Sequence, residues 1–438
     1  MTKERREKTV PQTRLTRLGH LGAMAGGVAG NMAANGLVQL GQGKRPTFRD
    51  LMLTPTNVTR VTNQLAKMRG AAMKIGQLVS MDTGDFVPPE LAKIMARLRE
   101  DGDSMPPSQL KKQLNGQWPQ GWLASFASFD VRPVAAASIG QVHRALLKDG
   151  RDLAIKIQFP GVKQSIDSDV SNVGALIRMS GLLPKGFDLA PYLKEAAAQL
   201  HSETDYDAEA AALAQFGTLL APRSGFIVPR VHPDWSTPQI LAMDFVSGIP
   251  IEDTVSQPQA ERNRIGTALI TLTLDEMFRF GVMQTDPNFA NYRYQPETGK
   301  IVLLDFGATR NIDPLIIEQY RRLLRAGWTD DAETQLAAAR DIGFFDQNTA
   351  PAHRDQLQAM LKLIFATLRE DRSIDFANQP VAKQLQTAGL DLINDGFVPP
   401  PLPIDALLLQ RKLAGVFLIC ARLGAMVDVD ALITPHLS

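Results

Sequence analysis

The chain has 438 residues, 44% hydrophobic and 21% charged, as is typical of a soluble globular protein with room for two or three packed units. Its 47 Lys and Arg residues nearly balance its 46 Asp and Glu residues, which argues against a general nucleic-acid-binding surface. The single cysteine excludes an internal disulfide framework and fits a reducing compartment, and the 6 scattered histidines form no structural zinc pattern.

The N-terminal segment, residues 1–45, is first basic and then rich in glycine and alanine. Gly22, Gly26 and Gly30 recur every fourth residue, a spacing that lets two helices approach closely in a bilayer and so permits a homodimer. Polar residues interrupt the segment 18–41, and it contains few large apolar residues, so it is a poor membrane-spanning helix. A helix packed on protein or lying on a membrane surface fits this segment equally well.

Residues 46–125 form a predicted helical extension. Apolar residues in 58–81 recur at spacings of three and four, as expected for one face of a helix, and Lys74 and Gln77 lie within this pattern. Pro-Pro pairs bracket a further short helix at 90–99 and mark linkers.

Strand signals begin near residue 126 and open a predicted β-containing unit, residues 126–248. Asp149 and Gly150 form an Asp-Gly hairpin signal. In the strand that returns from this turn, apolar residues alternate with others, which places Lys156 on the face opposite to the apolar one. Lys156 is either a solvated strand lysine or a contact to phosphate groups.

The loop before this hairpin occupies the place of a phosphate-covering loop. It has one glycine where a nucleotide-binding loop would normally use three, so the loop alone is a weak signal. Its candidate nucleotide contacts are Ala135, Ala136, Ala137 and Ser138.

An evenly spaced acidic run lies in the segment 164–221, which reads as helical. The run consists of Glu203, Asp205, Asp207 and Glu209. On a helix these four side chains cannot all lie on one solvated face. Glu209 begins an Ala-rich stretch suited to packing inward, which makes it the candidate ion-pair partner of Lys156. The alternative is a solvated helix start, where acidic residues favour the positive end of the helix dipole.

Residues 226–246 predict two strands around a turn, and a Ser-Gly-Ile-Pro sequence ends the second strand sharply. In a two-lobed enzyme this crossing is the hinge. Adenine would bond to backbone groups near Asp244 and Val246, with Met243 behind. The next helix, predicted at 260–280, is apolar nearly all round, as expected for a buried central helix.

The most informative stretch runs through residues 283–309. Asp286 and Asn291 stand on a predicted loop, a hairpin follows, and its second strand ends in the Asp-Phe-Gly sequence that begins at Asp305. Mg²⁺ takes one or two carboxylate oxygens together with phosphate oxygens and water, so Asp305 is the principal predicted metal ligand and Asn291 the second. Asp286 is predicted to face the attacking oxygen in phosphoryl transfer. The alternative is a solvated loop beside a hairpin.

The rest of the C-terminal unit, residues 249–438, is predominantly helical. Pro314 opens a helix almost directly after the Asp-Phe-Gly sequence, which leaves no activation segment to hold a peptide. The last apolar run, 413–421, is too short to span a bilayer, so the segment 407–426 predicts a buried core helix.

Together these residues resemble the UbiB/ADCK family of atypical protein-kinase-like proteins, in its coenzyme Q biosynthesis branch. The sequences that carry the resemblance are KIGQ at 74–77, AAASIGQVH at 135–143, AIK at 154–156, ETD at 203–205, QTDPNFAN at 284–291 and DFG at 305–307. The resemblance implies an α+β, bilobal protein-kinase-like fold. The N-terminal helical KxGQ extension, 46–125, would precede an N-lobe with the Ala-rich loop and inserted helices, 126–248, and a helical C-lobe, 249–438.

The resemblance also implies binding of ATP and Mg²⁺. It implies a regulatory set that restricts peptide access and favours ATP hydrolysis or a small or lipid substrate. This set consists of Lys74 and Gln77 near Glu203 and Asp205. In other branches of the family His-Ala replaces Gln284-Thr285, but Asp286 remains.

The resemblance implies a role in ubiquinone biosynthesis. It also implies a bacterial source and a cytoplasmic protein that is peripherally associated with the inner membrane. Its implied partners are quinone-biosynthesis enzymes and lipid or quinone precursors. The leading hypothesis is therefore an atypical kinase or ATPase that uses MgATP. One alternative is a true protein or small-molecule or lipid kinase, and another is a non-catalytic nucleotide-binding scaffold at a membrane. Phosphate release without an acceptor would separate the leading hypothesis from a true kinase.

Overall fold

The computed structural model describes residues 104–180, 189–370 and 373–437, together with separate positions between 26 and 75. Predictions on most of the Gly/Ala-rich segment, on Gln77 and on the helix at 90–99 lie outside the described residues. The chain divides into two compact units. Unit 1 comprises residues 1–211 and 230–245, and unit 2 comprises residues 212–229 and 246–438.

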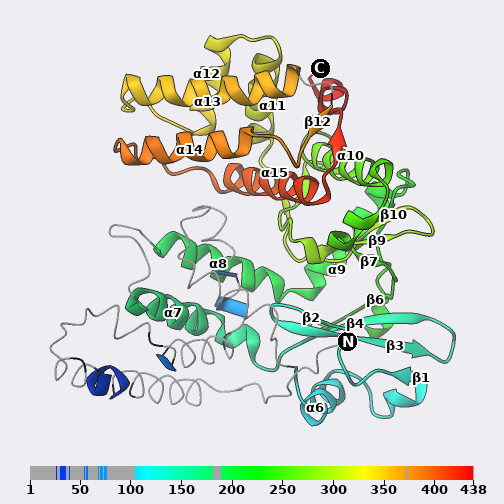
Figure 1. Ribbon diagram of the computed structural model, residues 1–438. Coiled ribbons are helices and arrows are strands. Elements are labelled where there is room, and N and C mark those ends of the chain that lie inside the picture. Colours follow the sequence, from blue (N-terminus) through cyan, green and yellow to red (C-terminus); the bar gives the residue numbers. More distant parts are fainter. Residues whose placement is uncertain are drawn as a thin grey trace. The chain divides into compact units, whose positions relative to one another are not determined.

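The described part of unit 1 contains an antiparallel sheet flanked by helices (Figure 1). Its strands are β1 (Phe126–Phe129), β2 (Ala135–Ala136), β3 (Gly140–Leu147), β4 (Asp152–Gln158) and β6 (Ile240–Asp244). Its helices are α6 (Pro107–Gln117), α7 (Val162–Ser180), α8 (Ala190–Glu203) and the first turns of α9 (Tyr206–Leu220). The strand order is β1-β3-β4-β6, with β2 paired to β3. The predicted Asp-Gly hairpin is confirmed, because β3 and β4 pair in antiparallel register around Gly150, whose φ is 92°.

One face of this sheet carries the core of unit 1. Leu153, Ile155 and Ile157 of β4 are fully buried in it, as the alternation in the sequence predicts. Helix α6 and an aromatic cluster cover this face, and their main residues are Leu110, Leu114, Trp118, Trp122 and Phe126. Since successive strand residues point to opposite faces, Lys156 is left on the other face of the sheet.

The predicted helical region 164–221 contains parts of three helices, and the acidic run is divided between two of them. Helix α8 ends at Glu203. Asp205 then starts α9, because its Oδ1 accepts the backbone N–H of Ala208 at 2.9 Å. Within α9, Asp207 is exposed whereas Glu209 is buried, so only one of these two acids points inward.

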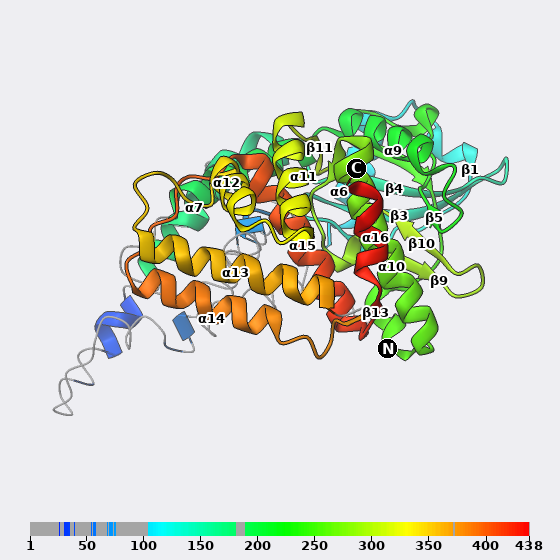
Figure 2. The ribbon, with the colours of Figure 1, turned by 90° about the horizontal axis from the view of Figure 1, so that it is seen from above.

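The described part of unit 2 is mostly helical. Its helices are the rest of α9, α10 (Gln259–Asp275), α11 (Pro314–Trp328), α12 (Ala332–Ile342), α13 (Pro351–Glu370), α14 (Val381–Asn394), α15 (Ile404–Leu423) and α16 (Val429–Ile433). Its strands are β5 (Phe226–Ile227), β7 (Ile249–Pro250), β8 (Val282–Gln284), β9 (Tyr292–Gln295), β10 (Lys300–Leu303), β11 (Thr309–Asn311), β12 (Ile374–Asp375) and β13 (Met426–Val427). The sheets are β5-β10-β9-β7, β8-β11 and β12-β13. Helices α13 and α14 lie side by side (Figure 2).

The two strands predicted within 226–246 are present as β5 and β6, and they belong to different sheets. The first segment, β5, pairs in parallel with β10, whereas β6 pairs with β4 of the other sheet. The predicted hairpin after Asn291 is present as β9 and β10, which pair in antiparallel register. The predicted helix at 260–280 is present as α10, but its last turn, Glu276–Phe280, is π-helical and ends at Gly281 with a φ of 64°.

The predicted helix at Pro314 is confirmed as α11, whose first turn is capped by the side chain of Asp313. Helix α15 matches the predicted core helix, and its Cys420 is fully buried against Gly266. Burial raises the pKa of the Cys420 thiol to about 12. Among the described helices none is long and apolar enough to cross a membrane.

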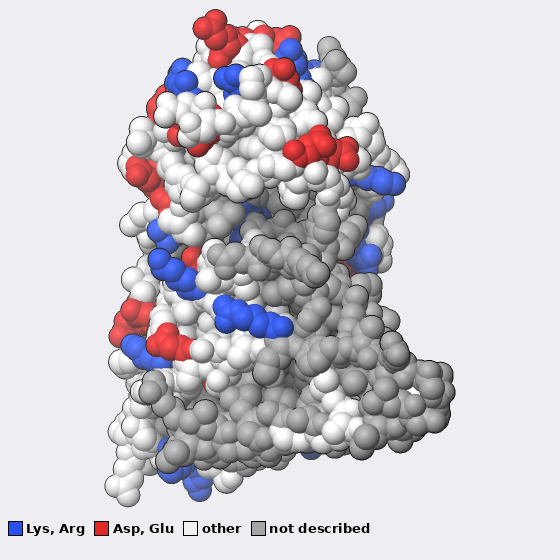
Figure 3. Space-filling view, turned by 90° about the vertical axis from the view of Figure 1, so that its left-hand side faces the viewer, with Lys and Arg blue, Asp and Glu red and all other residues white. Residues whose placement is uncertain are grey.

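On the face drawn in Figure 3, Lys and Arg side chains of the described residues are interspersed with Asp and Glu side chains. This mixture agrees with the near-balance of charge in the sequence.

Candidate active site

Lys156 of β4 and Glu209 of α9 form a buried ion pair in unit 1. The Lys156 Nζ lies 2.8 and 2.9 Å from the two carboxylate oxygens of Glu209. The exposed fraction is 6% for Lys156 and 1% for Glu209. The ammonium also lies 5.3 Å from the centre of the Tyr206 ring, in cation–π range. Alternation along β4 and the inward side of α9 thus bring together the two residues that the sequence proposed as a pair.

The Ala-rich loop lies against residues of the KIGQ and ETD motifs. Ala135 and Ala136 form β2, and the side chain of Ser138 donates a hydrogen bond to Glu203. The other Glu203 oxygen lies 2.7 Å from the Nζ of Lys74, which is 3% exposed. A Cβ atom at Gly70 would lie 2.7 Å from the Ser138 carbonyl oxygen, so the two backbones approach closely here.

The structure does not show the predicted contacts of Asp205 and Gln77 in the regulatory set. Asp205 is exposed and caps α9 through its Oδ1, so its observed contact is a helix cap. Gln77 lies outside the described residues.

The predicted adenine contacts lie where β6 ends. Met243 pairs with Ala154 of β4 and is 5% exposed. The Asp244 carboxylate lies 2.7 Å from the Nε2 of His232, and the Asp244 N–H donates to the Arg230 carbonyl at 2.9 Å. Val246 is half-buried and is the first residue of the second segment of unit 2.

In unit 2, residues 284–292 bring two predicted site residues together, and they are called the catalytic loop here after the role that the sequence predicts for them. The side-chain amide of Asn291 donates to the carbonyl oxygen of Asp286 at 3.0 Å. The Asn291 carbonyl in turn accepts the N–H of Leu304, at the entry to the Asp-Phe-Gly sequence, at 3.0 Å. These two hydrogen bonds, one from the side chain and one to the backbone, fix Asn291 between the loop and Asp305.

Two contacts anchor the Asp-Phe-Gly sequence. The Asp305 Oδ1 accepts the N–H of Gly307 at 3.0 Å. The Phe306 ring is 2% exposed, and its centre lies 4.7 Å from that of Phe216, on the part of α9 that belongs to unit 2. Aromatic pairs at this separation add to the stability gained from burial alone.

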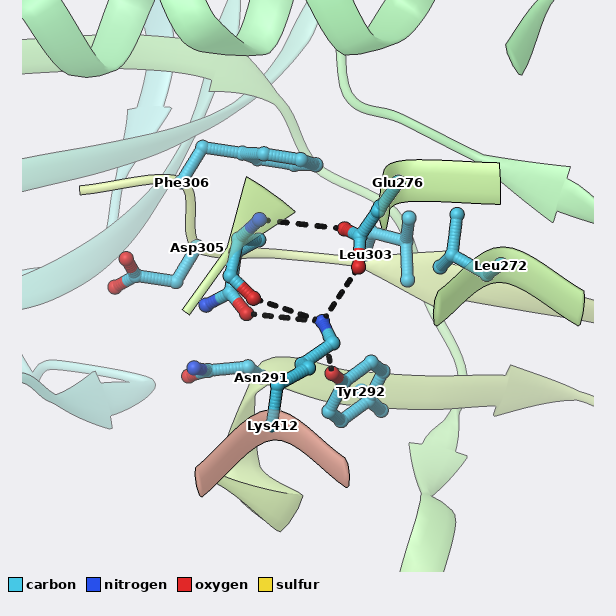
Figure 4. Close-up of a pocket in the computed structure, with 9 residues that line it drawn as sticks. Leu272, Glu276, Asn291, Tyr292, Leu303, Asp305, Phe306 and Lys412 are labelled. Carbon is cyan, nitrogen blue, oxygen red and sulfur yellow. Dashed lines mark hydrogen bonds and ion pairs between the residues drawn. The ribbon is translucent and has the colours of Figure 1, made fainter. Parts of the chain in front are cut away.

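Asn291 and Asp305 line one pocket, which Figure 4 shows in close-up. The ends of these two side chains lie on one side of it, and the Lys412 amine with Glu276 and Tyr292 lies on the other. Because the Asn291 amide nitrogen donates to Asp286, its side-chain oxygen is the atom suited to a cation. One carboxylate and one neutral oxygen fit Mg²⁺, which relies on water and phosphate for its remaining ligands. The described residues contain no group of three or more His, Cys, Asp or Glu side chains that could hold a metal without such help.

A second buried ion pair, between Lys412 and Glu276, lines this pocket. The Lys412 Nζ lies 3.0 Å from Glu276, and the exposed fraction of either side chain is 2% or less. Burial raises the pKa of Glu276 against the effect of Lys412. Burial opposes the charge on Lys412, but the neighbouring Glu276 and Tyr292 outweigh it and raise the Lys412 pKa.

Sequence reasoning missed three of these residues. Glu276 lies in the π-helical turn, and Arg411 and Lys412 lie in α15, directly before the apolar run 413–421. The Arg411 Nη2 lies 2.9 Å from Asp286, which is 125 residues away in the sequence. The available signal was two adjacent cations in the first half of a helix that is otherwise suited to the core.

Comparison with known proteins identifies the family of the chain. The ABC1 atypical kinase-like domain matches residues 97–338. The mitochondrial atypical kinase COQ8 of Saccharomyces cerevisiae is 38% identical over 427 residues, which cover 96% of this chain and 84% of the relative. The mitochondrial atypical kinase COQ8B of Danio rerio is 36% identical over 424 residues, covering 96% of this chain and 68% of the relative.

Among solved structures, the complex of Rv3197 with erythromycin from Mycobacterium tuberculosis matches with a TM-score of 0.60 and 25% identity. The match covers 85% of this chain and 93% of that chain. The chain therefore belongs to the ABC1 atypical kinase-like family and is an atypical kinase-like enzyme with an α+β, kinase-like fold.

Proposed function

We propose that this enzyme binds ATP with Mg²⁺ and transfers the terminal phosphoryl group to water or to a small or lipid acceptor in support of ubiquinone biosynthesis. The observation that carries the proposal is the pocket shared by Asn291 and Asp305, with Asn291 bonded to the loop residue Asp286. The likeness to relatives named COQ8 supports the link to ubiquinone.

Each residue has a defined part in this proposal. Lys156, oriented by Glu209, would contact the α- and β-phosphates, with the Ala-rich loop covering them and β6 and Val246 receiving the adenine. Asn291 and Asp305 would hold Mg²⁺, which neutralises the charge that develops on the phosphates. Asp286 would accept a hydrogen bond from the attacking water or hydroxyl group and so orient it.

The KxGQ segment is proposed to restrict access of protein substrates. Glu203 supports this reading, because it contacts both Lys74 of that segment and Ser138 of the Ala-rich loop. We propose that Gln77 acts with Lys74 in this occlusion. We also propose that the protein associates peripherally with the inner membrane. Lys74→Ala is expected to increase phosphorylation of added protein acceptors, and an unchanged level would remove occlusion from the proposal.

The decisive experiment compares wild type with Asp305→Asn. Purified wild-type protein is expected to release phosphate from ATP in the presence of Mg²⁺ without an added acceptor, and Asp305→Asn is not. In a deletion strain, wild type is expected to restore the quinone content and Asp305→Asn to leave it low. Restoration by Asp305→Asn would instead favour a non-catalytic scaffold, and turnover that requires an added hydroxyl compound would favour a true kinase.

A further inference from the structure

Helix α15 contacts the catalytic loop through three residues within five positions of each other. Arg411, Lys412 and Gly415, here called the loop brace, each contact a different part of residues 284–292. Both the helix and the loop lie in unit 2. The contacts are local in space although the two segments are far apart in the sequence.

Lys412 joins the two ends of the catalytic loop. Its Nζ donates to the carbonyl oxygen of Gln284 at 2.8 Å and lies 3.4 Å from the hydroxyl of Tyr292. The same ammonium is neutralised by Glu276, from the turn that precedes β8. A buried ammonium with three fixed partners tolerates little displacement, because each lost contact leaves a desolvated polar group.

Arg411 contacts the residue inside the loop on which the proposed chemistry depends. Its Nη2 lies 2.9 Å from the Oδ1 of Asp286, and the exposed fraction is 7% for the Arg411 side chain and 17% for that of Asp286. A guanidinium is planar and its donors are fixed, so this contact restricts the direction of the carboxylate more than a lysine could.

Gly415 brings the backbone of α15 against the residue that follows Asp286. A Cβ atom at Gly415 would lie 2.2 Å from the Cγ of Pro287 and 2.4 Å from its Cβ. The proline ring fixes φ and cannot move aside independently of the backbone. Only glycine therefore allows this approach of helix and loop.

We propose that the loop brace is a positioning device that holds Asp286 in the orientation needed for phosphoryl transfer. In conventional protein kinases, contacts of the activation segment control the arrangement of the catalytic groups. Here only the short strand β11 separates the Asp-Phe-Gly sequence from α11, which begins at Pro314, and α15 supplies the contacts instead. Arg411 is thus a positioning residue for Asp286, and this inference rests on the function proposed above.

The test uses the full-length protein with Arg411→Gln, Arg411→Lys and Arg411→Ala. Arg422→Gln is the matched control, since Arg422 is exposed on the same helix. Arg411→Gln is expected to lower kcat about 100-fold, the scale of loss when a reacting group is displaced by about 1 Å. The dissociation constant of MgATP, measured by calorimetry, is expected to stay at the wild-type value. Arg411→Lys should retain part of kcat, and added guanidinium should restore part of the turnover of Arg411→Ala.

A second variant acts on the same loop without removing a charge. Gly415→Ala is expected to lower kcat by pushing Pro287, again with unchanged MgATP affinity. Equal turnover of Arg411→Gln and Arg422→Gln, or parallel loss of turnover and MgATP affinity, would overturn the positioning role. The positioning role and the proposed function fail in different ways. If only the positioning role is wrong, Arg411→Gln turns over ATP like wild type and Asp305→Asn does not. If the proposed function is wrong, Asp305→Asn also behaves as wild type.

Discussion

The buried pair of Lys156 and Glu209 makes a sharp prediction about stability. At 2.8 Å and an effective dielectric constant of about 20, the two charges attract each other by about 6 kcal/mol. Removing each ion from water costs several kcal/mol, so the net contribution of the intact pair is small. Removing one partner, in contrast, leaves the other charge desolvated and is expected to destabilise unit 1 by about 3–5 kcal/mol.

A double-mutant cycle measures this difference. Lys156→Met and Glu209→Leu are each expected to lower the free energy of unfolding by about 3–5 kcal/mol, and the double variant by much less than the sum. Denaturant unfolding followed by tryptophan fluorescence reports mainly on unit 1, which contains three of the four tryptophans, Trp118, Trp122 and Trp235. The double variant should regain stability but not MgATP binding, because the ammonium is absent.

Additive losses in the cycle would refute this reasoning, because they would mean that the two side chains contribute independently of each other. Recovery of MgATP binding in the double variant would remove Lys156 from the proposed phosphate contacts.

Three further predictions concern packing, protonation and metal. A Cβ at Gly140 would lie 2.2 Å from the Ile157 carbonyl oxygen, so Gly140→Ala should lower the free energy of unfolding by about 1–3 kcal/mol. Gly217 lies in α9 with open space around it, so Gly217→Ala should raise the free energy of unfolding by about 0.5–1 kcal/mol. Thermal unfolding distinguishes the two variants. Burial lowers the pKa of His143 below its usual 6.5, so the unfolded chain binds a proton that the folded chain does not, and stability should fall as the pH decreases below 6.5. His143→Asn should reduce this pH dependence in melting experiments, and an unchanged slope would contradict the assignment. Chelation of divalent metal by EDTA should stop ATP turnover until Mg²⁺ is added, and turnover that persists in EDTA would refute the metal roles of Asn291 and Asp305.

Local patterns predicted those features whose causes are local in the sequence. The Asp-Gly turn and the alternation after it placed Lys156 on its face of β4, since strand geometry leaves only two choices. The inward position of Glu209 followed from the Ala-rich start of α9. The hairpin after Asn291 likewise follows from alternating residues around a turn sequence.

Features that depend on distant contacts were not predictable. The two-residue strand β5 carries no signal for its parallel pairing with β10, which depends on packing about 75 residues away. Glu276 of the π-helical turn is buried against Lys412, which is far away in the sequence, so its ion pair has no local signal. In the sequence Arg411 and Lys412 only bound an apolar run, and the fold brings them to Asp286 and Gln284.

The burial of Cys420 means that the reactivity of its thiol can be used to measure local opening of the fold. A thiol that is shielded from solvent and whose pKa is raised to about 12 reacts with an alkylating reagent only after α15 separates from Gly266. Because the chain has no other cysteine, the labelling rate reports on unit 2 alone, while tryptophan emission is dominated by unit 1. The opening of the two units can therefore be followed separately in the unmutated protein, without any introduced cysteine or tryptophan.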